Sequence, residues 1–171
     1  MFSEKATIKV ECLFSDNRQH RYLMTKIWDK AKSKASVISI APSLDCNVRS
    51  DLTTMLITNN LFSLDFGGFD LLNLYSRIGI NLKTTTNFAD AYDQNTNDVI
   101  LDSVSKSDVT ILAWGRITKK LVKSKEEEIL KLLEPHKSKL KVIADLQNRE
   151  GLHPLTPAVR SNFLLRDYVK E

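Results

Sequence analysis

The feature of this sequence that most constrains its fold is a repeated alternation of short apolar runs with helical patterns. Four runs have the length and the β-branched or large apolar residues that are typical of buried strands. They are Ser36–Ile40, Phe69–Tyr75, Val109–Trp114 and Leu140–Ala144. Strands that alternate with helices favour a parallel sheet that is covered by helices on both faces. We therefore expect a three-layer α/β/α fold.

Apolar residues at helical spacing predict four helices around these strands. They are Ser50–Leu61, Asn97–Lys106, Ser124–Glu134 and a last helix that begins at Thr156-Pro157. Ser50 is the expected N-cap of the first helix. Ser124 and Glu127 have the spacing of a capping box, and the Thr156 hydroxyl is the expected cap of the last helix.

The residues before the first of these strands predict a β-hairpin. Ala6–Phe14 and Arg21–Trp28 alternate polar and apolar residues, and the turn-rich segment 15–19 separates them. The 171 residues are 42% hydrophobic and include only five glycines and four prolines, so we expect one domain, 1–171, with one core. The apolar runs are far shorter than the roughly 20 residues of a membrane span, and the first residues lack an apolar signal region. We therefore expect a cytoplasmic monomer without membrane contact.

Charge and cysteine content limit the partners of the chain. The formal net charge of +4 and the sequence pI of about 9.0 are compatible with a nucleic-acid partner. Two cysteines, Cys12 and Cys46, are too few for a disulfide framework or a zinc site. We expect no metal and no cofactor.

In α/β sheets of this kind, ligands bind beyond the carboxyl ends of the strands. After the first strand, the turn Ala41-Pro42-Ser43 either directs N–H groups at a ligand or simply joins a strand to a helix. Asn73 lies within an apolar strand, where an unpaired amide costs roughly 1–3 kcal/mol. Its partner is therefore either the backbone of a neighbouring loop or a ligand that needs both a donor and an acceptor, such as a nucleobase edge.

The third and fourth strand ends add basic residues and a histidine. Gly115 allows a tight exit from the third strand. Arg116, Lys119, Lys120 and Lys123 follow it, and they form either a solvated helix face or a patch that faces phosphates. After the fourth strand, His153 lies between Gly151 and Pro154. An imidazole fixed in this way can donate a hydrogen bond to a developing oxyanion.

Taken in chain order, these segments resemble motifs of the uracil-DNA glycosylase superfamily. The matching segments are Ala41-Pro42-Ser43, Leu71-Leu72-Asn73, Ile111-Leu112-Ala113-Trp114-Gly115 and His153-Pro154-Leu155-Thr156-Pro157. The superfamily has a Pro-containing turn, strands that end in Leu-Leu-Asn and Leu-Leu-Trp-Gly, and a loop of His-Pro-Ser type. The chain as a whole also resembles a bacterial and phage family, catalogued as a domain of unknown function, that is often carried on mobile elements.

The resemblance implies a four-stranded parallel sheet in the order 2-1-3-4. It also implies hydrolysis of the N-glycosidic bond of a flipped uracil, or of a related damaged or modified base, in single- or double-stranded DNA. Asn73 would then read the base, and His153 would stabilise charge on its O2 atom. The other implied contacts are Ala41, Pro42 and Ser43 with the substrate, and Leu155, Thr156, Pro157 and Arg160 with DNA.

Two positions depart from the superfamily pattern. Ala41 stands where the best-known branch has an aspartate that positions water, and Ser43 stands where that branch has a tyrosine that excludes thymine. Asp45 is the preferred substitute for the aspartate because it lies on the same turn, and Asp51 is the alternative. Two other functions stay open: a non-catalytic nucleic-acid-binding module with a degenerate base pocket, and an enzyme that acts on free nucleotides or nucleosides.

Overall fold

The computed structural model describes residues 1–42, 49–82, 84–86 and 88–169. The strands of these residues form one seven-stranded sheet in the order β1-β2-β4-β3-β5-β6-β7. Their bounds are β1 Lys9–Phe14, β2 Arg21–Ile27, β3 Lys34–Ser39, β4 Gly68–Asn73, β5 Val109–Leu112, β6 Leu140–Ala144 and β7 Leu164–Asp167. The central neighbours β4, β3, β5 and β6 pair in parallel, and the pairs β1–β2, β2–β4 and β6–β7 are antiparallel.

The expected four-stranded parallel sheet in the order 2-1-3-4 was therefore wrong, because the sheet is mixed and has seven strands. The N-terminal hairpin extends the sheet: β2 pairs with β4, with Met24 opposite Leu71. After Arg21 the residues of β2 are buried on one face of the sheet and partly buried on the other, and β1 forms the edge. At the other edge, β7 pairs with β6.

The expected last helix was also wrong. Pro157–Val159 forms a single 3₁₀ turn, and the chain then continues into β7. Val159 and Phe163 are spaced as on a helix, but both are buried in the hydrophobic cluster that also contains Ile57 of α1. Because Leu164 pairs with Ala144 of β6, the backbone there has the extended conformation of a strand where a helix was expected.

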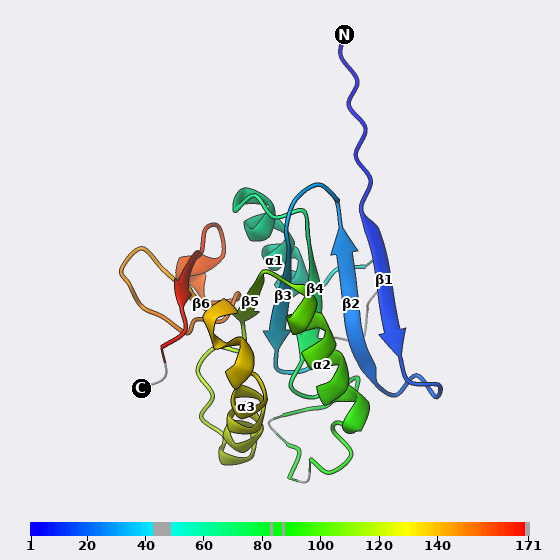
Figure 1. Ribbon diagram of the computed structural model, residues 1–171, viewed down its shortest axis with the longest axis vertical. Helices are drawn as coiled ribbons and strands as arrows, with labels where there is room; N and C mark the ends of the chain where they lie inside the picture. Colours follow the sequence, from blue (N-terminus) through cyan, green and yellow to red (C-terminus); the bar gives the residue numbers. More distant parts are fainter. Residues whose placement is uncertain (43–48, 83, 87, 170–171) are drawn as a thin grey trace.

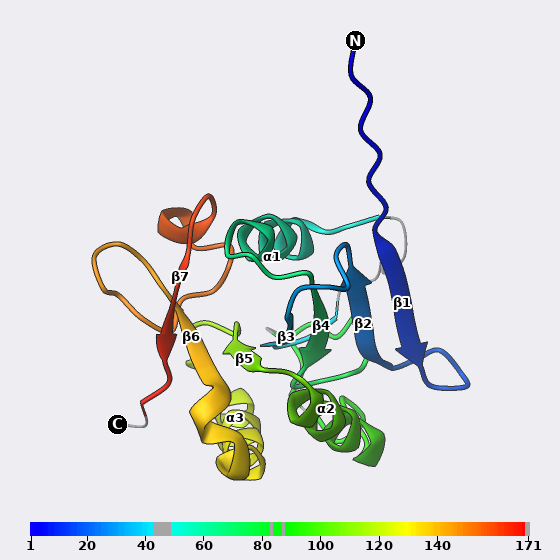
Figure 2. The same ribbon diagram turned by 45° about the horizontal axis from the view of Figure 1, so that its top comes forward.

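Helices cover both faces of the sheet. The helices are α1 Leu52–Ser63, α2 Gln94–Lys106 and α3 Lys120–Leu132. Figures 1 and 2 show α1 on one face, and α2 and α3 on the other, with β1 at one edge and the N-terminal segment extending beyond it. None of the helices in the described part of the chain has the length and apolar character that crossing a bilayer requires.

Helix starts differ from the expected ones where the local cap differs. Asp51, not Ser50, caps α1, because its carboxylate accepts a hydrogen bond from the backbone N–H of Thr54. The first residue of α3 is Lys120, four residues before the expected capping box at Ser124, and no side chain caps this helix. The N-terminus of α1, set by Asp51, lies at the carboxyl ends of β3 and β4.

Candidate active site

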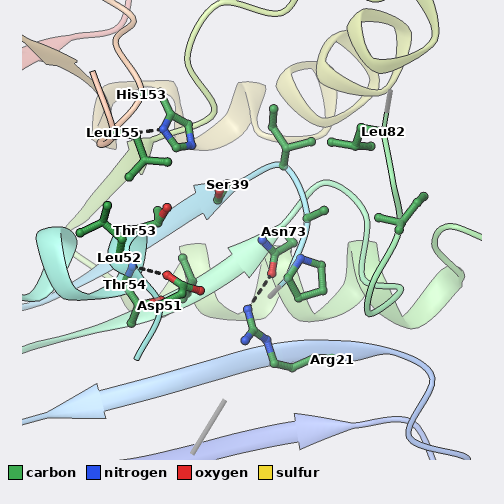
Figure 3. Close-up of a pocket in the computed structure, with 15 residues that line it drawn as sticks. Arg21, Ser39, Asp51, Leu52, Thr53, Thr54, Asn73, Leu82, His153 and Leu155 are labelled. Atoms are coloured by element: carbon green, nitrogen blue, oxygen red, sulfur yellow. Dashed lines mark hydrogen bonds between the residues drawn. The ribbon is translucent and has the colours of Figure 1, made fainter. Parts of the chain in front are cut away.

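A cavity of about 520 Å³ lies at the carboxyl ends of the parallel strands (Figure 3). Ser39 and Asn73 end β3 and β4 and are paired in register, so both reach the cavity. Because β2 runs antiparallel to β4, its first residue, Arg21, lies at the same edge. The N-terminus of α1 and the loop that follows β6, with His153, complete the wall.

Asn73 is held by Arg21, a partner that the sequence did not suggest. Both side chains are buried, with relative exposures of 2% and 1%. Nη2 of Arg21 donates a hydrogen bond to Oδ1 of Asn73 at 3.3 Å. A guanidinium has donors only, so the amide oxygen must be the atom that faces it. The amide nitrogen of Asn73 is consequently turned away from Arg21, as Figure 3 shows.

His153 is oriented by its own loop. Its Nδ1 atom accepts a hydrogen bond from the backbone N–H of Leu155 at 3.1 Å. Burial lowers the pKa of His153 from its ordinary value of 6.5, so the imidazole is neutral at neutral pH. A neutral imidazole has one N–H, and with Nδ1 as acceptor that proton is on Nε2. The wall formed by His153 therefore offers a hydrogen-bond donor.

Gly115 is needed where β5 leaves the sheet because His153 packs against it. Its φ is +71°, which favours glycine, and a Cβ atom at this position would lie 2.7 Å from Cβ of His153. The Trp114-Gly115 and His153-Pro154 segments, almost forty residues apart in the sequence, are thus in direct contact.

The loop after His153 is held at several points. The carbonyl of His153 accepts a hydrogen bond from the N–H of Thr156, and Nε of Arg160 donates to the carbonyl of Leu155, both at 2.8 Å. Asn60 of α1, which is 3% exposed, donates to the carbonyl of Arg160 and accepts from the N–H of Phe163. Sequence reasoning missed Asn60, although an amide among the apolar residues of a helix is the same signal that singled out Asn73.

Asp51 brings a carboxylate to the cavity wall. One of its oxygens, Oδ1, accepts from the N–H of Thr54 at 2.7 Å. Lys26, which is 6% exposed, lies behind this helix start and donates a hydrogen bond to Ser50. Burial lowers the pKa of Lys26, and the negative charge of Asp51 opposes that shift. The other expected aspartate, Asp45, lies outside the described residues, as does Ser43.

The remaining candidate residues divide into two groups. Ala41, Pro42 and Leu155 line the cavity together with Asn73 and His153. The expected DNA contacts Arg116, Lys119, Thr156, Pro157 and Arg160 do not line it, and of these Arg116, Pro157 and Arg160 are exposed.

The side chain of Lys119 binds the backbone of a neighbouring loop. Its Nζ atom donates hydrogen bonds to the carbonyls of Leu82 and Thr85, at 2.8 and 2.6 Å. Leu82 lines the cavity, so Lys119 holds a segment of the cavity wall.

Within the described ranges, the His, Cys, Asp and Glu side chains form no group of three or more that could bind a metal ion.

Together these features define an α/β protein with a mixed sheet and a polar cavity at the carboxyl ends of its parallel strands. The chain belongs to the family described as "Protein of unknown function (DUF1643)", whose model matches residues 21–155. The matched segment begins at Arg21 and ends at Leu155, both in the cavity wall, and therefore spans the whole of that wall. No curated protein and no solved structure matches the chain.

Proposed function

We propose that this protein is a DNA glycosylase that hydrolyses the N-glycosidic bond of uracil, or of a related damaged or modified base, and leaves an abasic site. One observation carries the proposal: His153, whose Nδ1 atom accepts a hydrogen bond from Leu155, lies across a cavity from the buried amide of Asn73. The resemblance of the strand-end motifs to the uracil-DNA glycosylase superfamily supports the same reading.

The chemistry needs a hydrogen-bond donor where negative charge develops. When the bond between C1′ of the sugar and N1 of a pyrimidine breaks, its electron pair leaves with the base, and charge accumulates on O2. The N–H of His153 is already oriented by its bond to Leu155, so it requires no reorganisation as that charge forms. Asn73 holds the edge of the base in place. Because a base must leave the duplex to enter such a cavity, the enzyme would first extrude it, at a cost of a few kcal/mol.

Water must then add to C1′ of the sugar. An aspartate would orient that water, accept its proton, and stabilise the positive charge on the sugar in the transition state. Asp51 lies in the cavity wall, and its Oδ1 atom makes the bond that caps α1. Asp45, which the sequence favoured for this role over Asp51, lies outside the described residues and stays a candidate beside it.

The same proposal makes DNA the partner, in single- or double-stranded form, of a monomer in the cytoplasm. Leu155, Thr156 and Pro157 would insert beside the extruded base, and Arg116 and Arg160 would contact phosphates. Each phosphate contact releases counterions, so the logarithm of the affinity should fall linearly with the logarithm of the salt concentration. An affinity for DNA that does not change with salt would contradict this part of the proposal.

A direct assay tests the proposal. The protein is incubated with labelled oligonucleotides that contain one uracil, or none, and alkali then converts abasic sites to strand breaks. We expect breaks at the uracil position, absent from the control strand and lost with His153→Ala. Salt-dependent binding without breaks at any base would point instead to the nucleic-acid-binding module. Release of base from free nucleosides, but not from DNA, would point to the nucleoside-processing enzyme.

A further inference from the structure

We infer that the cavity selects a base whose edge presents two adjacent hydrogen-bond acceptors, rather than the N3–H group of uracil. Two kinds of base have such an edge: a cytosine ring, through O2 and N3, and an oxopurine, through O6 and N7. The inference rests on the proposed function, and it narrows the substrate of the same site.

The first step is the orientation of the Asn73 amide. A uracil reader of the usual kind must accept a hydrogen bond from N3–H with its amide oxygen. Here that oxygen faces the guanidinium of Arg21, at 3.3 Å from Nη2. Both side chains are almost fully buried, and the hydrogen bond between them fixes which end of the amide faces Arg21. The atom that Asn73 presents away from Arg21 is the amide nitrogen, which is a donor.

The second step is the effect of the guanidinium on a ligand. The amide oxygen of Asn73 has a second lone pair, but an N–H group that used it would place its positive end beside a cation. Charges act strongly in a buried site of low dielectric constant, so this contact is unfavourable. A ring nitrogen or carbonyl oxygen in the same place would instead be attracted both to the amide N–H and to the positive charge.

The opposite wall also donates. His153 has its proton on Nε2 because Nδ1 accepts from Leu155. In Figure 3 His153 and Asn73 lie on opposite sides of the cavity, with Ser39 between them. A ligand between them therefore meets an N–H on each side and needs an acceptor for each. Uracil has such acceptors in O2 and O4, so the discrimination against uracil comes from its N3–H, which would lie beside the Arg21 guanidinium. The cavity, at about 520 Å³, falls in the usual range of roughly 300–1,000 Å³ for ligand pockets, so either ring size fits.

The test compares bases in one DNA context. Oligonucleotides that differ at a single position carry uracil, cytosine, 5-methylcytosine, guanine or hypoxanthine, and single-turnover excision is measured for each. We expect excision of a cytosine-type base or an oxopurine to be at least about tenfold faster than that of uracil, which corresponds to about 1.4 kcal/mol. The profile also shows which of the two ring types is used. Fastest excision of uracil would overturn the inference.

A second readout separates this inference from the proposed function. Binding of deoxycytidine, deoxyinosine and deoxyuridine to the intact protein is measured by calorimetry. If no oligonucleotide is cut but deoxycytidine or deoxyinosine binds more tightly than deoxyuridine, the selectivity stands and the glycosylase proposal fails. If nothing is cut and the three nucleosides bind equally or not at all, the inference fails as well.

A matched pair of variants tests the role of Arg21. Arg21→Met removes the donors but keeps most of the side-chain volume, so the Asn73 amide can turn and accept from N3–H. The rate of uracil excision, divided by the rate for the preferred cytosine-type base or oxopurine, should rise about tenfold. Arg21→Lys keeps a charged donor and should keep the wild-type preference. An unchanged ratio in a folded Arg21→Met protein would overturn the inference, and if that variant does not fold, the wild-type base panel still decides it.

Discussion

Gly115 and His153 are in contact so close that a Cβ atom on the glycine would lie 2.7 Å from Cβ of the histidine. This contact joins the exit of β5 to the loop that follows β6, and it fixes how far the imidazole reaches into the cavity. It also gives a physical reason for a glycine after Trp114, since any larger residue would displace the His153 backbone or side chain.

Gly115→Ala should therefore impair base excision more than it impairs stability. A shift of about 1 Å in a reacting group can lower the rate on the order of 100-fold, whereas a left-handed backbone costs a non-glycine residue roughly 1–2 kcal/mol. The matched control is Gly151→Ala, because Gly151 also has a positive φ, +65°, but an added Cβ would meet nothing within 4 Å. Both variants should lose the stability that a left-handed backbone costs, Gly115→Ala should also lose the cost of the displaced His153 loop, and only Gly115→Ala should lose excision. Equal loss of excision in the two would show that the contact with His153 is unimportant.

Asn60→Ala should destabilise the protein and loosen the loop that carries His153. It would leave the buried N–H of Phe163 without its partner and remove a donor to the carbonyl of Arg160. An unsatisfied buried group costs about 1–3 kcal/mol. The exposed neighbour Asn59 is the control, and Asn59→Ala should change the free energy of unfolding by less than about 0.5 kcal/mol. Similar unfolding midpoints for the two variants would contradict this role of Asn60.

The sequence could indicate the site because parallel strands bring their carboxyl ends to one edge. Asn73 and His153 were chosen as a polar residue in an apolar run and a histidine between Gly151 and Pro154, and the structure places both at one cavity. Their roles in base recognition and catalysis stay predictions. The same reasoning placed Ala41 and Pro42 at the cavity, since they follow the central strand β3.

The sequence could not indicate Arg21, because this residue reaches the cavity only through the antiparallel pairing of β2 with β4. Which strand pairs with which, across some forty residues of sequence, depends on how whole faces of the sheet pack. The alternation of polar and apolar residues within one strand does not reveal that partner. The strand β7 was missed for the same reason: Leu164–Asp167 is extended because it pairs with β6, whereas the preceding Pro157 and Val159 suggest a helix locally.

Asp51→Asn should separate the two roles of Asp51. Asparagine is about as good an N-cap as aspartate, so the free energy of unfolding should fall only by the cost of losing the negative charge near the buried Lys26. If the carboxylate orients water, single-turnover excision should slow markedly, because the amide cannot accept a proton. Asp45→Asn is measured beside it. Full activity in Asp51→Asn together with a slow Asp45→Asn would assign the water to Asp45 instead.

Acid should weaken the protein through His153. Burial holds the pKa of this side chain below its ordinary value of 6.5, so as the pH falls through 6.5 the unfolded chain takes up a proton that the folded protein does not. The protein therefore loses stability as the pH falls from 6.5 to the lower pKa of folded His153. Over the same pH range the folded imidazole stays neutral and can still donate from Nε2. Urea unfolding at about pH 7.5 and about pH 5.5 should show a smaller acid-induced loss in His153→Ala than in wild type. An equal loss in both would contradict the lowered pKa of His153.

The most direct test of the central claim is single-turnover base excision by wild type and His153→Ala on the same set of oligonucleotides. Loss of one preorganised donor at a developing oxyanion typically lowers the rate about 100- to 1,000-fold. Phosphate contacts supply most of the affinity for DNA, so DNA binding should persist in the variant. We predict excision by wild type, a fall of that size in His153→Ala, and similar affinities for DNA. Excision by His153→Ala at the wild-type rate, or excision of no base by the wild-type protein, would contradict the account.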